Sequence, residues 1–200
     1  MSYCGTAVGY TKDCDFPMFG GTERDVILLD YEDVKAELLE SLPGITFDAS
    51  LANLVTDFTF AASSGRAGYL VESNMNQIRP SYTHVQLNTG AFYTHSLTFH
   101  LPDNTAEADA FVKAWGDKRV VAIYKNKSKG EDGASKYKIL GLGNGLVRTE
   151  ASQDAYNENG VHVLTFASEE NTPETQPLYT LFKTDEATTD AIWTALQTPA

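Results

Sequence analysis

Histidine and cysteine are the residue types in this chain best suited to bind a metal or to act as a base or nucleophile. They are His84, His95, His100, His162, Cys4 and Cys14. His95 and His100 lie in an alternating segment at odd spacing, so their side chains point to opposite faces of a predicted strand and cannot share a metal ion. Neither cysteine has a nearby histidine or a further cysteine to complete a zinc site. We therefore expect no metal.

A glycine-rich segment and the carboxylates were the other candidates for chemistry. Gly141-Leu-Gly-Asn-Gly145 is superficially similar to a phosphate-binding loop, but the Lys and Ser or Thr that such a loop requires do not follow it. Its glycines fit better as turn positions with positive φ. The sequence has no Gly-x-Ser-x-Gly motif, and its acidic residues are scattered. We expect no catalytic residue, no cofactor and no enzyme activity, although a hydrolase with unrecognised carboxylates stays open.

The chain is acidic. It has 15 Lys and Arg residues against 27 Asp and Glu residues, and its formal net charge is −12. Proteins that hold nucleic acid tightly derive affinity from Lys and Arg that displace counterions from phosphates. The charge therefore argues against tight DNA binding. It suits a surface past which DNA moves without adhering, and it suits equally a protein that is merely soluble.

The sequence does not predict a membrane protein. Its longest apolar runs, 26–29 and 51–55, are far shorter than the ~20 residues of a spanning helix. The N-terminus has no basic start followed by an apolar stretch, so we expect no secretory signal and synthesis in a cytoplasm.

A sheet with a packed helix is predicted in the middle of the chain. Residues 92–101 alternate strictly, and a tight hairpin turn at 88–90 connects them to an alternating segment, 82–88, with which they should pair. A helix should follow, capped by Asn104 and carrying Phe111 and Trp115 on its apolar side. Further strands are predicted at 119–124, 136–141 and 161–166. We expect Phe111 and Trp115 to be buried against a sheet formed by strands 92–101 and 119–124.

The two ends of the chain differ from this middle part. Residues 1–24 read as an irregular N-terminal arm, followed by a strand at 26–31 and one or two helical turns within 30–42. Residues 168–200 form a C-terminal extension with a final helix, capped by Thr184 or Asp185. Its apolar side should contain Ala187, Ala191, Ile192, Ala195 and Leu196.

A basic segment stands out on the acidic chain. It is a loop or long hairpin tip that carries Lys125, Lys127, Lys129 and Lys136 against only Glu131 and Asp132. One interpretation is a solvated loop with no binding role. The other is that these lysines contact an acidic segment of a neighbouring subunit, for which 168–174, with Glu169, Glu170 and Glu174, is the candidate. These seven residues are our candidates for assembly contacts.

A series of sequence features lies between residues 87 and 166. They are the segment Leu87-Asn-Thr-Gly-Ala-Phe-Tyr-Thr-His-Ser-Leu-Thr-Phe99, the helix before Arg119–Tyr124, the strand Tyr137–Gly141, the turn Asn144-Gly-Leu146 and the strand Asn159–Phe166. This series resembles tail-tube-like structural proteins of phages, especially phages that infect Bacteroidota. The start of the chain, with Cys4, Cys14 and Gly20-Gly21, is also similar. The basic loop is longer than expected for this group, and the tail after Ala167 is not part of the pattern.

The resemblance implies one mainly β domain over residues 1–200, a β-sandwich or small barrel with one packed helix, to which the final helix is added. It implies a virion structural protein made in a host cytoplasm. Its copies would form hexameric rings, stacked into a tail tube around a channel through which DNA passes without tight binding. Other tail proteins would be further partners. Neck, terminator and hub rings share this architecture and stay open as alternatives.

A function of another class also stays open. The chain contains 10 Tyr and 10 Phe residues, which could form stacking platforms for sugars. A carbohydrate- or receptor-binding β module is therefore the rival interpretation.

Overall fold

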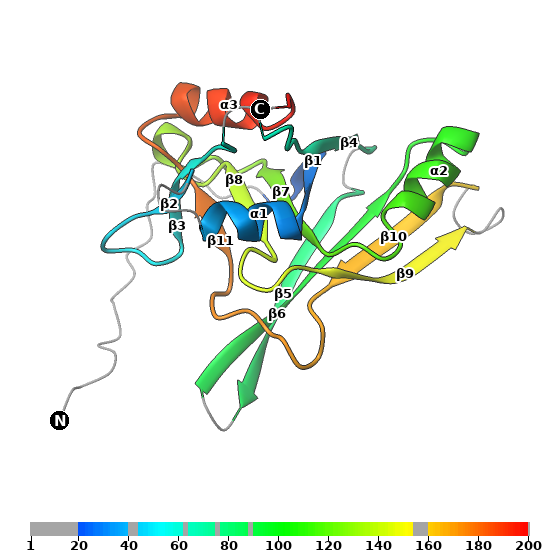
Figure 1. The fold of residues 1–200 in the computed structure, drawn as a ribbon, viewed down its shortest axis with the longest axis horizontal. Helices are drawn as coiled ribbons and strands as arrows, with labels where there is room; N and C mark the ends of the chain where they lie inside the picture. The colour runs from blue at the N-terminus through cyan, green and yellow to red at the C-terminus, as the bar shows by residue number, and fades with distance from the viewer. Residues whose placement is uncertain are drawn as a thin grey trace.

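The computed structural model describes residues 20–39, 44–61, 64–74, 77–87, 90–153 and 160–199. Within these ranges the chain is mainly β, as expected, with two sheets and three α-helices (Figure 1). The seven-stranded sheet has the order β2-β3-β11-β8-β7-β1-β4, and the four-stranded sheet has the order β5-β6-β10-β9.

The bounds of the elements are as follows. The large sheet consists of β1 (Thr22–Asp30), β2 (Ile45–Phe47), β3 (Leu54–Phe58), β4 (Tyr69–Glu72), β7 (Val120–Asn126), β8 (Tyr137–Leu140) and β11 (Tyr179–Leu181). The small sheet consists of β5 (Arg79–Leu87), β6 (Gly90–His100), β9 (Val147–Gln153) and β10 (His162–Ala167). The helices are α1 (Tyr31–Leu38), α2 (Ala106–Ala114) and α3 (Glu186–Ala195), with a 3₁₀ turn, η1, at Glu131–Gly133.

Two hydrophobic cores lie on opposite faces of the large sheet. The core between the two sheets contains Val26 and Leu28 of β1 and Phe99 of β6. The other core lies under α1 and α3, and it contains Ile27 and Leu29 of β1. Because β1 is buried on both faces, its apolar residues form a continuous run instead of an alternating one. The molecule therefore has three layers: the small sheet, the large sheet, and the pair α1 and α3.

The alternation predicted for residues 92–101 is confirmed. Leu97 and Phe99 are fully buried between the sheets, whereas Thr98 on the other face is half-buried. The predicted pairing with the preceding segment is also confirmed, since β5 and β6 are antiparallel, with Tyr82 opposite His95. The expected turn at 88–90 falls largely on residues 88–89, which lie outside the described residues. In Figure 1 this hairpin extends away from the rest of the molecule.

The prediction for the middle helix is correct in part. Its N-cap is Thr105 and not Asn104, because the Thr105 hydroxyl accepts a hydrogen bond from the Ala108 N–H at 3.3 Å. Trp115 is buried, as expected, but Phe111 is only half-buried. The expectation of one sheet under the helix is wrong, because strands 92–101 and 119–124 belong to different sheets. Alternation identifies the buried face of a strand but does not identify its neighbours.

The C-terminal extension is part of the body of the domain. It contributes β11, which lies between β3 and β8 in the large sheet. The final helix is capped by Asp185, one of the two expected residues. Its predicted apolar side is partly wrong, because Ala187, Ala191 and Ala195 are exposed. The buried side instead carries Thr189, Ile192, Trp193 and Leu196, whose larger apolar members gain more from burial than alanine does.

The N-terminal arm ends earlier than predicted. Strand β1 begins at Thr22, so the last residues of the expected arm belong to the large sheet. Residues 1–19, with Cys4 and Cys14, lie outside the described residues. The predicted short helix within 30–42 is confirmed as α1, which Asp30 caps by accepting from the Glu32 N–H.

We predict that Trp115→Ala lowers the free energy of unfolding by about 3–5 kcal/mol, because a large buried ring is removed from the core between the sheets. Phe111→Ala should cost less, since Phe111 is only half-buried. Urea unfolding followed by circular dichroism measures both. An unchanged midpoint for Trp115→Ala would show that this ring is not a core residue.

Candidate assembly interface

Strand β5 is a long edge strand with little protection. It has 9 residues, of which only Pro80 and Val85 are partly covered, while Tyr82 and Leu87 are large apolar residues that stay exposed. Its single charged residue is Arg79, at one end. Edge strands of monomeric proteins are usually short, charged or covered, because open N–H and C=O groups pair with other chains. Strand β5 is therefore suited to pair with another subunit.

The hydrogen bonds of β6 determine which backbone groups of β5 are open. On its far side β6 pairs with β10, where the Leu101 N–H donates to His162 O at 2.9 Å and His95 O accepts from the Ser168 N–H at 2.9 Å. Backbone groups alternate in direction along an antiparallel strand. The odd-numbered residues of β6 thus face β10, and the even-numbered residues face β5.

The register then places the free groups of β5. Thr94 of β6 is opposite Thr83 of β5, so the odd-numbered residues of β5 face β6. The N–H and C=O groups of Tyr82, His84 and Gln86 therefore point to the open side. Pro80 falls in the same row, where its missing N–H costs no bond within the sheet.

The opposite edge of the small sheet is also open. Strand β9 is the last strand on that side among the described residues, and it is largely exposed. Among the described residues, the small sheet thus has two edges without a neighbouring strand, β5 with 9 residues and β9 with 7.

The outer face of the small sheet is rich in hydroxyl groups. This face, opposite the core, carries Thr94, Ser96 and Thr98 of β6, and Thr98 Oγ1 lies 3.0 Å from Thr165 Oγ1 of β10. The register places few charged residues there in the described strands, chiefly Arg79 and Glu150. The face is therefore close to neutral.

The lysines predicted as assembly residues have partners within the chain. Lys129 Nζ lies 2.9 Å from Glu186 Oε1, and Lys136 Nζ lies 2.8 Å from the same oxygen. Lys136 Nζ also lies 2.6 Å from Asp190 Oδ1. These contacts attach α3 to the β7–β8 hairpin. The hydrogen bonds from Lys136 and Lys129 lower the pKa of Glu186 to about 2.

The other two lysines lie at the base of the same hairpin. Lys125 Nζ is 2.9 Å from Asp25 Oδ2 and 4.5 Å from the centroid of the Trp193 ring. Lys127 is partly buried, and its backbone N–H donates to Gly21 O at 3.1 Å. The predicted hairpin tip is confirmed by the β7–β8 pairing. A role of these lysines between subunits stays a prediction.

The three carboxylates predicted as assembly residues, Glu169, Glu170 and Glu174, belong to a different segment of the sequence from these lysines. Glu169 forms an ion pair with Arg119. Glu170 is exposed. Glu174 is 0% exposed, so its carboxylate serves the interior of the subunit.

Glu174 closes the glycine-rich turn. Its Oε2 accepts from the Gly143 N–H at 3.0 Å, and its Oε1 accepts from the Asn144 N–H at 2.9 Å. Burial raises the pKa of Glu174, although the two N–H groups act in the opposite direction. The predicted positive φ is confirmed for Gly141 and Gly145, at 74° and 75°, but not for Gly143.

His95 joins this network from the small sheet. The Gly141 N–H donates to His95 Nδ1 at 3.1 Å, so the ring proton is on Nε2, which lies 2.9 Å from Gln176 O. Burial lowers the pKa of His95 and keeps the ring neutral. Both ring nitrogens are in use, so His95 is not available as a base. We call His95, Glu174 and the turn 141–145 the His95–Glu174 network.

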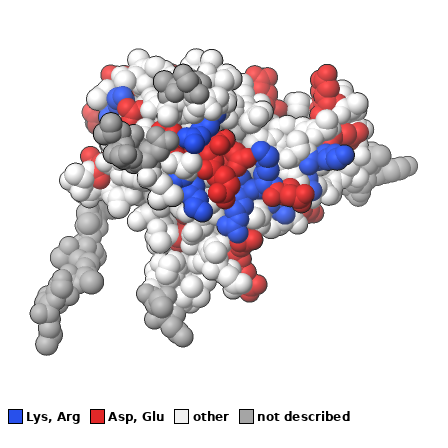
Figure 2. Space-filling model, in the orientation of Figure 1, with Lys and Arg blue, Asp and Glu red and all other residues white. Residues whose placement is uncertain are grey.

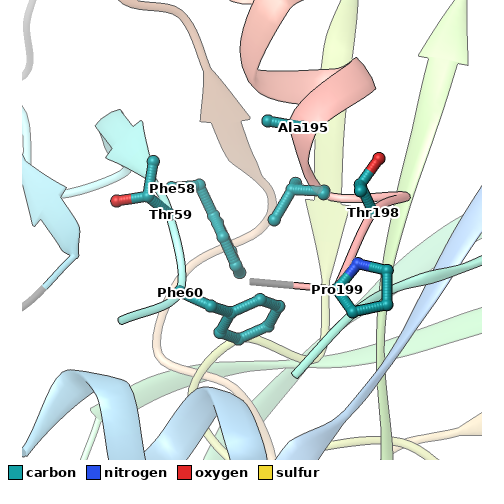
Figure 3. A pocket seen from close by; sticks show the side chains of 7 residues that line it. Phe58, Thr59, Phe60, Ala195, Thr198 and Pro199 are labelled. Atoms are coloured by element: carbon teal, nitrogen blue, oxygen red, sulfur yellow. The ribbon is translucent and has the colours of Figure 1, made fainter. Parts of the chain in front are cut away.

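An apolar hollow of about 280 Å³ lies where β3 ends against the last turn of α3. Phe58 and Phe60 line it from one side, with Ala195 and Pro199 on the other (Figure 3). Its lining contains no ionisable side chain. It therefore has no group for acid–base catalysis or metal binding.

Basic side chains do not gather into one patch on the face shown in Figure 2. Figure 2 shows acidic and basic residues intermixed across the middle of the face that it presents. Several cations are used in ion pairs, including Lys118 with Asp30 at 2.6 Å and Arg66 with Glu37 at 3.0 Å. Within the described part of the chain we find no group of three metal-ligating side chains and no helix long and apolar enough to cross a membrane.

Comparisons with known proteins identify no relative. A scan of protein-family models, a search of curated proteins and a search of solved structures found no match to this chain. The resemblance of residues 88–166 to tail-tube-like proteins therefore stays a proposal.

Sequence reasoning did not identify the open edge of β5 as a site. Pro80 was the available signal, because proline inside a strand is confined to edges and bulges. The burial of Glu174 had no such signal, since nothing in its immediate sequence distinguishes it from Glu169 and Glu170.

We predict that protonation of Glu186 weakens the docking of α3. Its pKa in the folded chain, about 2, is below that of a free glutamate, ~4.3, so its stabilisation is present above pH ~4.3 and is lost as the pH falls toward 2. Glu186 is 37% exposed, so screening limits the effect. Glu186→Gln should lower the free energy of unfolding by at most about 1 kcal/mol at pH 7, and this difference should shrink toward zero as the pH falls through 2.

Urea unfolding of the wild type and Glu186→Gln over this pH range measures the difference. The control is Glu131→Gln, which removes an exposed carboxylate from the same hairpin. Equal losses in the two variants at neutral pH would mean that Glu186 does not hold α3.

Proposed function

We propose that this protein is a virion structural subunit, a phage tail-tube protein whose copies form hexameric rings stacked around a DNA channel. The observation that carries the proposal is the small sheet with its two open edges, β5 and β9. In a monomer such edges invite uncontrolled pairing, whereas in a ring each edge is covered by the next subunit. The ordered resemblance of residues 88–166 to tail-tube-like proteins supports the finer assignment.

The position of the two edges favours a ring over a simple dimer. Strands β5 and β9 lie at opposite sides of one sheet. Pairing of β5 with β9 of a neighbour is a head-to-tail contact, which repeats from subunit to subunit and closes when the rotation fits a whole turn. A symmetric β5–β5 contact would leave both β9 edges open. We therefore assign β5 and β9 to the contact within a ring.

In the proposed ring, the outer face of the small sheet lines the channel. The large sheet covers the core face of the small sheet, so the free face in a ring is the one with Thr94, Ser96 and Thr98. Tight binding to DNA requires concentrated cations, which this face does not provide in its described strands. A nearly neutral wall permits DNA to move past it.

We predict weak binding of duplex DNA by the assembled protein at physiological ionic strength, where charges are screened over about 8 Å. Fluorescence anisotropy of labelled duplex DNA over a salt series is the measurement. A dissociation constant in the nanomolar range at this ionic strength would contradict the channel assignment.

We predict that the purified protein forms rings or tubes and that His84→Pro prevents this. The N–H of His84 points to the open side of β5, so proline removes a donor for the neighbour without breaking a bond to β6. Negative-stain imaging and mass measurement in solution report assembly, and circular dichroism reports folding.

Two further variants test whether the lost backbone donor, and not the lost side chain, prevents assembly. His84→Ala retains the backbone donor and should assemble. Gln86→Pro removes another donor in the same row and should reproduce the effect of His84→Pro. If both proline variants fold and assemble as the wild type does, β5 is not the contact strand. A wild type that stays monomeric at high concentration would contradict the ring proposal itself.

One observation favours the rival sugar-binding function. The rings of Tyr82 and His84 lie 5.9 Å and 5.7 Å from that of Tyr93, and together they form an aromatic cluster on the β5–β6 hairpin. Aromatic faces of this kind can stack on sugar rings. A monomer that binds glycans in an array, and loses binding in Tyr82→Ala, would favour this function over tube assembly.

A further inference from the structure

A groove of about 440 Å³ lies between β4 and the segment that leads into α2. Leu101, Ala108 and Phe111 form its wall on the α2 side, and Leu70 and Val71 form the β4 side. Leu70 is 40% exposed although it is a large apolar residue. Figure 1 shows β4 and α2 as neighbours at the upper part of the molecule, away from the projecting hairpin.

The β4 side of this groove is an open sheet edge. Strand β4 is the last strand of the large sheet among the described residues. The Ser73 N–H donates to Arg24 O at 2.9 Å, on the side of β1. By the alternation of an antiparallel strand, Val71 also faces β1, and the N–H and C=O groups of Leu70 and Glu72 face the groove. An extended peptide can therefore pair with these groups.

The rim of the groove is acidic. Glu72, Asp103 and Glu107 line it and are exposed, and none of them forms an ion pair with another described residue. The groove therefore favours a cationic occupant.

We propose that this groove binds an extended segment of a partner protein, in which Lys or Arg residues alternate with apolar residues. The segment adds as a strand to β4, its apolar side chains contact Phe111 and Leu101, and its cations meet the acidic rim. A second copy of this chain is a poor occupant, because its net charge of −12 brings further negative charge to the rim. The groove lies on the large sheet, so the proposal does not depend on ring formation through the small sheet.

The probe is a fluorescent peptide, acetyl-Lys-Val-Lys-Val-Lys-Val-amide, added to the full chain and followed by anisotropy. We expect saturable binding that weakens with salt. The same peptide with methylated backbone nitrogens at alternate residues should bind much more weakly, because it cannot pair with a strand edge. A Glu-Val peptide of equal length should not bind.

Charge reversal locates the site. The triple variant Glu72→Lys, Asp103→Lys and Glu107→Lys should weaken the Lys-Val peptide on the order of tenfold, from three exposed charge contacts. The matched control changes Asp117, Glu131 and Glu32, exposed carboxylates outside the groove, to Lys. It should bind within about twofold of the wild type, because rim charges act over short range at physiological salt.

Three results would overturn the proposal. They are no binding of the Lys-Val peptide at millimolar concentration, equal binding of the backbone-methylated peptide, and equal weakening by the two triple variants. Displacement of the peptide on subunit assembly would place a second copy in the groove and would also overturn the assignment to a partner protein.

Discussion

A carboxylate that accepts hydrogen bonds from backbone N–H groups stabilises the turn that connects the two sheets. Glu174 is fully buried and binds the N–H groups of Gly143 and Asn144, in the turn that leads from the large sheet to the small one. His95 of the small sheet accepts from Gly141 in the same turn. A buried acceptor left unpaired costs about 1–3 kcal/mol, and more when it is charged, so the buried Glu174 carboxylate depends on both of these donors. The chain then continues from Glu174 into β11, which places the C-terminal part inside the large sheet.

The sequence could predict elements whose residues have a regular period. Leu97 and Phe99 alternate with hydroxyl residues, and the 106–114 helix has its apolar residues on one side, so both elements were found with nearly correct bounds. The arrangement of the strands was not accessible in this way. Strands β6 and β7 both look like core strands, and only contacts between distant segments assign them to different sheets. Strand β11, with 3 residues, is too short to show a period.

For the candidate site as well, the sequence predicted local features but not contacts between distant segments. The sequence identified the lysines of the β7–β8 hairpin as a basic group, but it could not show that Lys129 and Lys136 are attached to Glu186 and Asp190 of the final helix. Residues fifty or more positions apart in the chain form these pairs, and no local pattern records them. Lys129 and Lys136 thus hold the C-terminal helix of their own chain in place. The edge strand β5, in contrast, has a single charged residue and would pair through its backbone groups.

The proline in β5 has a consequence for how two copies could align. Along the open side of this strand, Tyr82, His84 and Gln86 each present a donor and an acceptor, whereas Pro80 presents an acceptor alone. A neighbouring strand displaced by two residues toward Pro80 would leave one of its carbonyl groups without a donor. The favourable alignments are therefore limited to those that avoid this position. In the proposed ring, the missing N–H of Pro80 would disfavour this one register of the contact between neighbouring subunits.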